Sequence, residues 1–290
     1  MAGLNMFVDR IDDATGAQLE EMLRSAGYEF REVEYARFGA KGESVSVVLY
    51  TSGKLVVQGK GASDFRLHRL QELTGLPEPR LKVATIGCDE AGKGDYFGPI
   101  VAAAVAMTPE EEQFLDEIPL CDSKTLSDRQ IAGAAEHLRN VVSHEVIVIG
   151  PRRYNELYAK FQNVNHLLAW AHGKAMLAVK DKTGIDHVLL DKFCDESVVK
   201  RALGARSSEI DLHSRPRAED DPAVAAASLL ARDAFVRGID RLRHVAGRPL
   251  PKGAGSPVLK AGRELVKERG RGILAEVAKV HFRTTGQLGG

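Results

Sequence analysis

The spacing of apolar residues predicts a small α+β domain at the start of the chain. Leucines and a methionine recur at helical spacing over residues 17–26, which indicates an amphipathic helix. The period then changes to two over residues 29–36, 44–50 and 54–58, as in strands with one buried face. A second helical pattern covers residues 63–74. We therefore expect a helix and an antiparallel sheet here.

Strand and helix patterns alternate in the rest of the chain. Apolar strands are expected at residues 83–87, 99–107, 145–149 and 185–190, and helices at residues 127–140, 163–181 and 223–242. This alternation predicts an α/β sheet with a functional site at the strand ends.

A proline-rich segment separates the two patterns. Pro77 and Pro79 follow a helical stretch and precede an apolar strand, and proline interrupts both helices and sheets. We therefore expect an N-terminal domain at residues 1–76, a linker at 77–82 and a second domain at 83–290.

Composition narrows the class of protein. The chain has 290 residues, 44% of them hydrophobic, which excludes disordered and collagen-like architectures. Its 40 basic and 40 acidic residues cancel, so any polyanion binding must come from local clusters. Neither a membrane-spanning run nor a signal peptide is evident, and we expect a cytoplasmic protein without membrane contact.

The cysteines and histidines give no sign of a metal site. The three cysteines lie far apart and are interpreted as buried thiols. None of the nine histidines stands at metal-ligand spacing from another histidine or a cysteine, so they are interpreted as surface or core groups.

Acidic residues at the ends of predicted elements carry the strongest chemical signal. Asp89 and Glu90 follow one apolar strand, and Asp191 follows another. Glu219 precedes the helix at 223–242, where a carboxylate could also serve as a helix cap. Together these carboxylates match what two divalent ions about 3.5–4 Å apart require. The neighbouring Asp220 and Asp221 leave open which acid is the fourth ligand.

A glycine-rich loop follows the first acids. Gly92 and Gly94 flank Lys93, so the backbone can approach a ligand while the lysine supplies charge. The loop contains most of a nucleotide-binding P-loop pattern, but position 94 is glycine where a serine or threonine must hold magnesium. Two acids inside the loop would also repel phosphates, which disfavours a nucleotidase.

Four segments resemble, in order, the motifs of ribonuclease HIII, a bacterial type 2 ribonuclease H. They lie at residues 89–99, 122–127, 190–193 and 218–228, and residues 50–59 resemble the substrate-binding N-terminal domain of that family. The related ribonuclease HII shares the catalytic core, but it lacks this N-terminal domain and usually has arginine where Lys93 stands.

The resemblance implies an RNase H-like α/β fold, a mixed sheet with flanking helices, preceded by a small α+β domain like the TATA-binding protein. It also implies a role for particular residues. The residues expected to bind metal and carry catalysis are Asp89, Glu90, Asp191 and Glu219, and those expected to bind backbone phosphates are Ser123 and Lys124.

The predicted function is a metal-dependent endonuclease that hydrolyses the RNA strand of RNA/DNA hybrids, leaving 5′-phosphate and 3′-hydroxyl ends. Two Mg²⁺ or Mn²⁺ ions would act during turnover. The Gly92-Lys93-Gly94 loop, which has no side chain at either glycine, suits the shallow minor groove, where 2′-hydroxyls lie. Lys54 and Lys60 are expected to bind the duplex, although a solvated sheet face would look alike. We expect a monomer without an obligate protein partner.

Two alternatives remain at this stage. A ribonuclease HII-like enzyme would prefer a single ribonucleotide within DNA. A nucleic-acid binding protein without activity would use the acids only as caps and surface charge.

Overall fold

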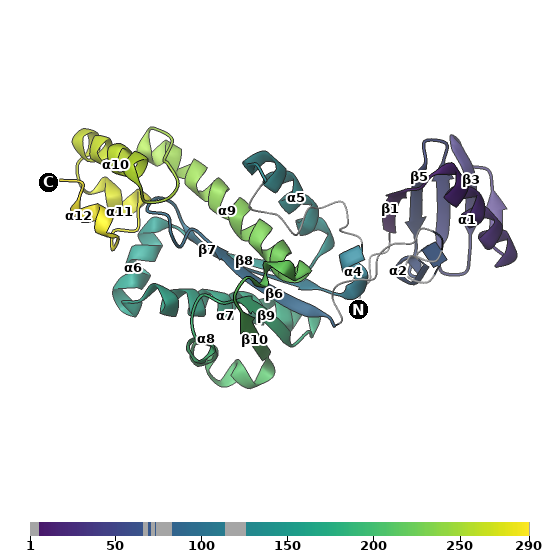
Figure 1. Ribbon diagram of the computed structural model, residues 1–290, viewed down its shortest axis with the longest axis horizontal. Coiled ribbons are helices and arrows are strands. Elements are labelled where there is room, and N and C mark those ends of the chain that lie inside the picture. Colours follow the sequence, from purple (N-terminus) through teal and green to yellow (C-terminus); the bar gives the residue numbers. More distant parts are fainter. Residues whose placement is uncertain (1–5, 66–68, 71–72, 74–82, 114–125, 290) are drawn as a thin grey trace. The chain divides into compact units, whose positions relative to one another are not determined.

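The computed structural model describes residues 6–65, 69–70, 73, 83–113 and 126–289 (Figure 1). Its contacts divide the chain into two compact units. One comprises Met1–Arg80 with Glu110–Phe114, and the other comprises Leu81–Pro109 with Leu115–Gly290. The expected linker at 77–82 lies outside the described residues.

The first unit is built on a five-stranded antiparallel sheet in the order β1-β5-β4-β3-β2. Its elements are β1 (Met6–Arg10), α1 (Asp13–Ser25), β2 (Glu29–Arg31), β3 (Ala36–Lys41), β4 (Ser46–Tyr50), β5 (Lys54–Gln58) and α2 (Ala62–Phe65). Leu19 and Leu23 of α1 pack with Val47, Leu49 and Leu55 of the sheet. The predicted small α+β domain is thereby confirmed.

One predicted strand of this unit is wrong. The alternating residues 29–36 form the whole of β2, a turn and the first residue of β3 rather than one strand. Tyr35 adopts a φ of 61°, and the Ala36 amide donates to the Val33 carbonyl at 3.0 Å, which closes the turn. Alternation alone does not reveal this turn because its residues are neither glycine nor proline.

The second unit is built on a mixed sheet in the order β10-β9-β6-β7-β8. The strands are β6 (Thr85–Ala91), β7 (Ile100–Met107), β8 (His144–Ile149), β9 (His187–Asp191) and β10 (Asp211–Arg215). Strands β6, β9 and β10 run parallel, whereas β7 is antiparallel to both β6 and β8. The predicted α/β class is therefore confirmed, with β7 running opposite to the other four strands.

Helices surround this sheet. They are α5 (Asp128–Val141), α6 (Pro151–Phe161), α7 (Val164–Thr183), α8 (Glu196–Leu203), α9 (Pro222–Ala246), α10 (Ser256–Arg269), α11 (Ile273–Val277) and α12 (Arg283–Gly286), with the 3-10 turns η3 (Gly204–Glu209) and η4 (Ala218–Asp220). The short helix α4 (Pro109–Gln113) belongs, from Glu110 onward, to the first unit. Among the helices in the described parts of the chain, none is both long and apolar enough to cross a membrane.

Strand β7 shows how the layers form, because it is buried on both faces. Val101, Ala103 and Val105 pack with α5 and α9, whereas Ala104 and Ala106 pack with α7. Successive side chains of a strand point to opposite faces, so an uninterrupted apolar strand needs a helix layer on each side. Figure 1 shows α9 and α7 on the two sides of the sheet.

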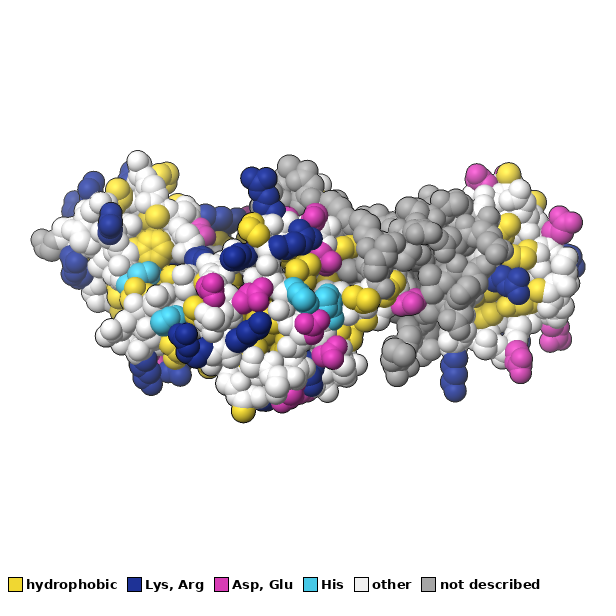
Figure 2. Space-filling model, turned by 60° about the horizontal axis from the view of Figure 1, so that its bottom comes forward, with side chains coloured by type: hydrophobic (Ala, Val, Ile, Leu, Met, Phe, Trp, Pro, Cys, Tyr) yellow, Lys and Arg dark blue, Asp and Glu magenta, His cyan; other side chains and the backbone are white. Residues whose placement is uncertain are grey.

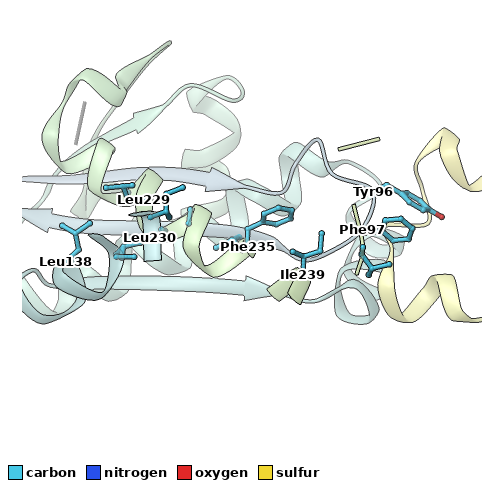
Figure 3. Packing of buried hydrophobic residues seen from close by; sticks show 14 of the residues in the cluster. Tyr96, Phe97, Leu138, Leu229, Leu230, Phe235 and Ile239 are labelled. Atoms are coloured by element: carbon cyan, nitrogen blue, oxygen red, sulfur yellow. The ribbon is translucent and has the colours of Figure 1, made fainter. Parts of the chain in front are cut away.

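Helix α9 also supports the loop between β6 and β7. Its buried face runs from Leu229 and Leu230 through Phe235 and Ile239 toward Tyr96 and Phe97 (Figure 3), and all six belong to one apolar cluster. Tyr96 and Phe97 are fully buried. This packing fixes the segment that follows the glycine-rich loop.

The cysteines behave only partly as expected. Cys88 is buried in β6, but Cys194 is half-buried and its Sγ contacts the Asp195 carbonyl at 3.4 Å. Cys121 lies outside the described residues.

Candidate active site

Asp89 and Asp191 lie next to each other at the same end of the sheet. The parallel register pairs Cys88 of β6 with Leu190 of β9, so the two aspartates are the next residues along neighbouring strands. Asp89 accepts a hydrogen bond from the Ser228 side chain of α9. Asp191 Oδ1 accepts one from the Ala218 amide of η4 at 3.1 Å. The sheet register therefore gathers acids that are far apart in the sequence.

The two adjacent acids of β6 point in opposite directions. The sequence predicted that Asp89 and Glu90 follow the strand, but both lie within it. Because side chains alternate along a strand, Asp89 faces α9, while Glu90 faces α7. Glu90 Oε2 lies 3.2 Å from Nε2 of the fully buried His172, and its Oε1 lies 3.6 Å from Lys93 Nζ.

His172 is a residue of the site that the sequence did not indicate. Its ring stacks on Phe193, with centroids 5.1 Å apart, and its Nδ1 has no hydrogen-bond partner in the described part of the chain. The ring is therefore held by packing and by Glu90. His172 is a buried core group, as expected, but its contact with Glu90 was not predicted, since a lone histidine in a helix carries no signal of a carboxylate partner.

The electrostatics at Asp89 favour a cation. Burial, together with the negative charges of Glu90 and Asp191, raises the pKa of Asp89 to about 7. An all-carboxylate donor set is also what hard divalent cations such as Mg²⁺ and Mn²⁺ prefer. The residues present thus fit a divalent metal.

The acids do not converge tightly in this structure. Among the described residues, no three of them bring their ligand oxygens within 4.8 Å of one another.

Three consecutive acids before α9 have different surroundings. Asp221 is the N-cap of α9 and accepts from the Ala223 and Val224 amides. Asp220 is exposed and forms an ion pair with Arg215. Glu219 is half-buried in η4, directly after the residue whose amide binds Asp191. This arrangement favours Glu219 as the fourth acid of the site.

The two glycines of the loop differ in what they require. Gly92 has a φ of +86°, and a Cβ there would lie 2.3 Å from the Pro99 carbonyl oxygen, so only glycine fits. Gly94 is exposed, its φ lies outside the left-handed region, and a Cβ there would meet no described atom within 4 Å. The fold therefore explains Gly92 but places no demand on Gly94.

Lys279 holds the segment that follows Gly94, and the sequence gave no indication of this role. The side chain is fully buried, and its Nζ donates to the carbonyls of Asp95 at 2.8 Å and Gly98 at 2.9 Å. Burial lowers the pKa of Lys279 to about 7. The loop is further tied by Asp95, whose Oδ1 accepts from the Gly253 amide at 2.5 Å.

The remaining predicted substrate-binding residues lie outside the described residues or in the first unit. Ser123 and Lys124 lie outside the described residues. Lys54 and Lys60 are exposed in the first unit, where Lys60 and Lys41 line a shallow hollow of about 520 Å³. On the face shown in Figure 2, basic and acidic side chains are interspersed, in keeping with a net charge of zero.

Comparison with known proteins gives consistent matches. The family model described as Ribonuclease HII matches residues 86–285, and a domain of unknown function matches residues 7–66. The ribonuclease HIII of Protochlamydia amoebophila is 40% identical, covering 98% of this chain and 97% of the relative. That of Chlamydia pneumoniae is also 40% identical, covering 97% of each.

Solved structures match over the same length. The crystal structure of Bst-RNase HIII in complex with Mn²⁺ has a TM-score of 0.67 and 28% identity, and it covers 98% of this chain and 97% of its own. Aquifex aeolicus RNase H3 has a TM-score of 0.58 and 28% identity, covering 95% of this chain and 100% of its own. Both units are therefore matched within single known proteins.

Proposed function

Since the chain belongs to the ribonuclease HIII family, we propose that Asp89, Glu90, Asp191 and Glu219 are the acids with which it cleaves its substrate. The enzyme is an endonuclease that hydrolyses the RNA strand of RNA/DNA hybrids and depends on a divalent metal, as its family does. The observation that carries the assignment is the register of β6 and β9, which places Asp89 beside Asp191.

Four acids from three elements would hold the metal. Asp89 of β6 and Asp191 of β9 would supply carboxylate oxygens on the α9 face, together with Glu219 of η4. Glu90 would supply oxygens from the opposite face of β6, where His172 orients it. When bound, Mg²⁺ or Mn²⁺ activates the attacking water and stabilises the charge on the leaving 3′-oxygen. Cleavage of this bond leaves 5′-phosphate and 3′-hydroxyl ends.

Recognition of RNA is assigned to the loop at Gly92, Lys93 and Gly94. Gly94 is exposed and leaves open space where a side chain would stand, which is the shape that close approach to ribose requires. A backbone group bonded to a 2′-hydroxyl distinguishes RNA from DNA, whereas phosphate contacts cannot. Lys93 adds positive charge next to Glu90.

Other residues bind the duplex backbone. We assign Lys54 and Lys60, both exposed in the first unit, to phosphate contacts, together with Ser123 and Lys124. One chain carries all four acids, so we propose that the monomer is active and needs no protein partner. We further propose that it acts in the cytoplasm, where hybrids form during transcription and replication.

A cleavage assay on three duplexes tests this function. The substrates are an RNA/DNA hybrid, a DNA duplex with one ribonucleotide and plain double-stranded DNA, each with Mg²⁺, with Mn²⁺ and with EDTA. We expect metal-dependent cleavage within the RNA strand of the hybrid and none of plain DNA. Preference for the single ribonucleotide would assign ribonuclease HII-like specificity instead, and absence of metal-dependent cleavage would refute the proposal.

A further inference from the structure

A second group of metal-ligating side chains lies at the opposite end of strand β9. His187 is the first residue of β9, and Asp211 and His213 belong to the neighbouring parallel strand β10. The register pairs His187 directly with Asp211. His213 is two residues beyond Asp211 and therefore lies on the same face of the sheet.

The three side chains converge on one another. Asp211 Oδ2 lies 3.3 Å from His187 Nδ1 and 3.0 Å from His213 Nε2. The centroids of the two imidazole rings are 5.1 Å apart. In the described part of the chain this is the one group of three such residues whose ligand atoms all lie within 4.8 Å of one another.

We propose that His187, Asp211 and His213 form a binding site for a transition-metal ion of the Zn²⁺ class, completed by water. Two imidazole nitrogens and one carboxylate oxygen are a common three-residue ligand set for such ions. Ligand atoms about 2.0–2.1 Å from a tetrahedral ion are about 3.3 Å apart, close to the two Asp211–histidine distances. Only the histidine rings must draw together to complete the site.

The exposure of the side chains provides an entry path. Their exposed fractions are 34% for His187, 63% for Asp211 and 54% for His213, so an ion can reach all three from solvent. The strand starts are already held together, since the Asp211 amide donates to the Asp186 carbonyl at 2.9 Å. An ion here would join β9 to the edge strand β10.

This site is distinct from the catalytic acids in place and in chemistry. Asp191 follows His187 by four residues of the same strand, or about 13 Å at 3.3 Å per residue. Mg²⁺ prefers oxygen ligands and does not favour imidazole, whereas Zn²⁺, Ni²⁺ and Cu²⁺ do. The proposal does not depend on the proposed function.

Metal titration of the full-length protein tests the site. Protein stripped of metal is titrated with Zn²⁺ by calorimetry in excess Mg²⁺, and the wild type is compared with a His187→Gln/His213→Gln double variant and with Asp211→Asn. All of these leave the catalytic acids intact, so zinc bound at those acids cancels in the comparison. His137→Gln removes an exposed histidine of α5 and is the matched control.

The wild type and His137→Gln should bind one more equivalent of Zn²⁺ than the double variant, and Asp211→Asn should bind it at least tenfold more weakly. Electron paramagnetic resonance of bound Cu²⁺ should show nitrogen coupling that the double variant loses. Equal zinc stoichiometry in wild type and double variant would overturn the proposal and leave an ordinary surface hydrogen-bonded cluster. Circular dichroism confirms that each variant is folded, and Asp211→Asn provides the result should the double variant fail to fold.

Discussion

Asparagine and glutamine have nearly the same shape as aspartate and glutamate but carry no charge. Replacing each acid of the site by its amide therefore tests the role of its charge. We expect Asp89→Asn, Glu90→Gln and Asp191→Asn each to keep the fold and hybrid binding while lowering turnover at least a hundredfold, because each removes a negative charge that binds metal. Glu219→Gln should behave alike. Turnover on hybrids in saturating Mg²⁺, measured beside hybrid affinity, checks this expectation.

Asp220→Asn is the matched control for Glu219, since Asp220 is exposed and paired with Arg215 rather than directed to the other acids. It should keep turnover within a few-fold of wild type. A loss comparable to that of Glu219→Gln would transfer the fourth ligand to Asp220.

The two loop glycines give a second test at this scale. Gly92→Ala places a methyl group 2.3 Å from the Pro99 oxygen at a φ of +86°, so it should lower the free energy of unfolding by at least about 1 kcal/mol. Gly94→Ala meets no described atom and should leave the melting temperature nearly unchanged. It should nevertheless reduce turnover on hybrids strongly, because the methyl group stands where the groove approaches.

Normal turnover of Gly94→Ala together with an unchanged melting temperature would mean that the loop does not contact the sugar. Replacing the 2′-hydroxyls beside the cut with hydrogen is the complementary measurement. It should abolish cleavage while duplex binding persists.

The lowered pKa of Lys279 predicts that the stability of the protein depends on pH. Its pKa is about 7 in the folded state and about 10.5 in the unfolded state, so between these values the unfolded chain binds more protons. Stability due to this group therefore rises with pH from 7 to 10.5, by on the order of 4 kcal/mol. The free energy of unfolding of wild type and Lys279→Met is measured with denaturant at pH 6.5 and pH 10. The difference between the two proteins should change between these pH values. A difference that stays constant with pH would contradict the buried, neutralised lysine.

Residues such as Asp89 and Asp191 could be predicted because an acid directly after an apolar strand stands out in the sequence. Lys279 could not, since nothing in its neighbourhood distinguishes it from a surface lysine. The choice between Glu219 and Asp220 depends on Arg215, which belongs to a strand the sequence did not predict. The assignment of the acids and of the substrate-binding residues stays a prediction that these variants test.

At the scale of elements, the site depends on how closely α9 approaches β6. A Cβ at Gly87 would lie 2.1 Å from the Ala223 carbonyl carbon and 2.2 Å from the Val224 amide nitrogen. Gly87 therefore lets the start of α9 lie directly on the strand that carries Asp89, within reach of Ser228.

Gly87→Ala should push α9 away from the sheet and destabilise the protein by about 1–3 kcal/mol or more, since the neighbouring atoms are backbone and cannot rotate aside. Turnover should fall even where the variant is fully folded, because Asp89 and η4 would separate. Thermal unfolding and activity at low temperature check the two parts. Wild-type stability would show that α9 can shift without cost.

Some elements were predicted well, whereas helices α6, α8 and α10 and strand β10 were missed. Helix α7, strand β5 and strand β7 lie within a few residues of their expected bounds. Strand β10 reads Asp-Leu-His-Ser-Arg and has no apolar run, because an edge strand exposes much of its length to water. Strand pairing also depends on contacts between distant segments, so the convergence of His187 with Asp211 and His213 had no local signal.

At the scale of the whole molecule, the two units carry different parts of the proposed machinery. All four proposed catalytic acids lie in the second unit, whereas Lys54 and Lys60 lie in the first. The function of the first unit is therefore testable by removal. The matched control in the full chain is a Lys54→Gln/Lys60→Gln double variant, which removes two charges and keeps the domain.

A truncated chain beginning at Lys82 should fold, keep weak metal-dependent cleavage and lose most of its affinity for hybrids, because it neutralises fewer phosphates. Each lost phosphate contact should lower the slope of log affinity against log salt by about 0.7–0.9. The Lys54→Gln/Lys60→Gln variant loses at most two phosphate contacts, so its slope should fall by at most twice this amount. Its cleavage rate at saturating substrate should not change. Affinity measured from low to moderate salt for all three proteins gives the slopes. If truncation left both affinity and slope unchanged, the first unit would serve something other than substrate, since a domain that contacts the duplex backbone cannot be removed without releasing fewer counterions on binding.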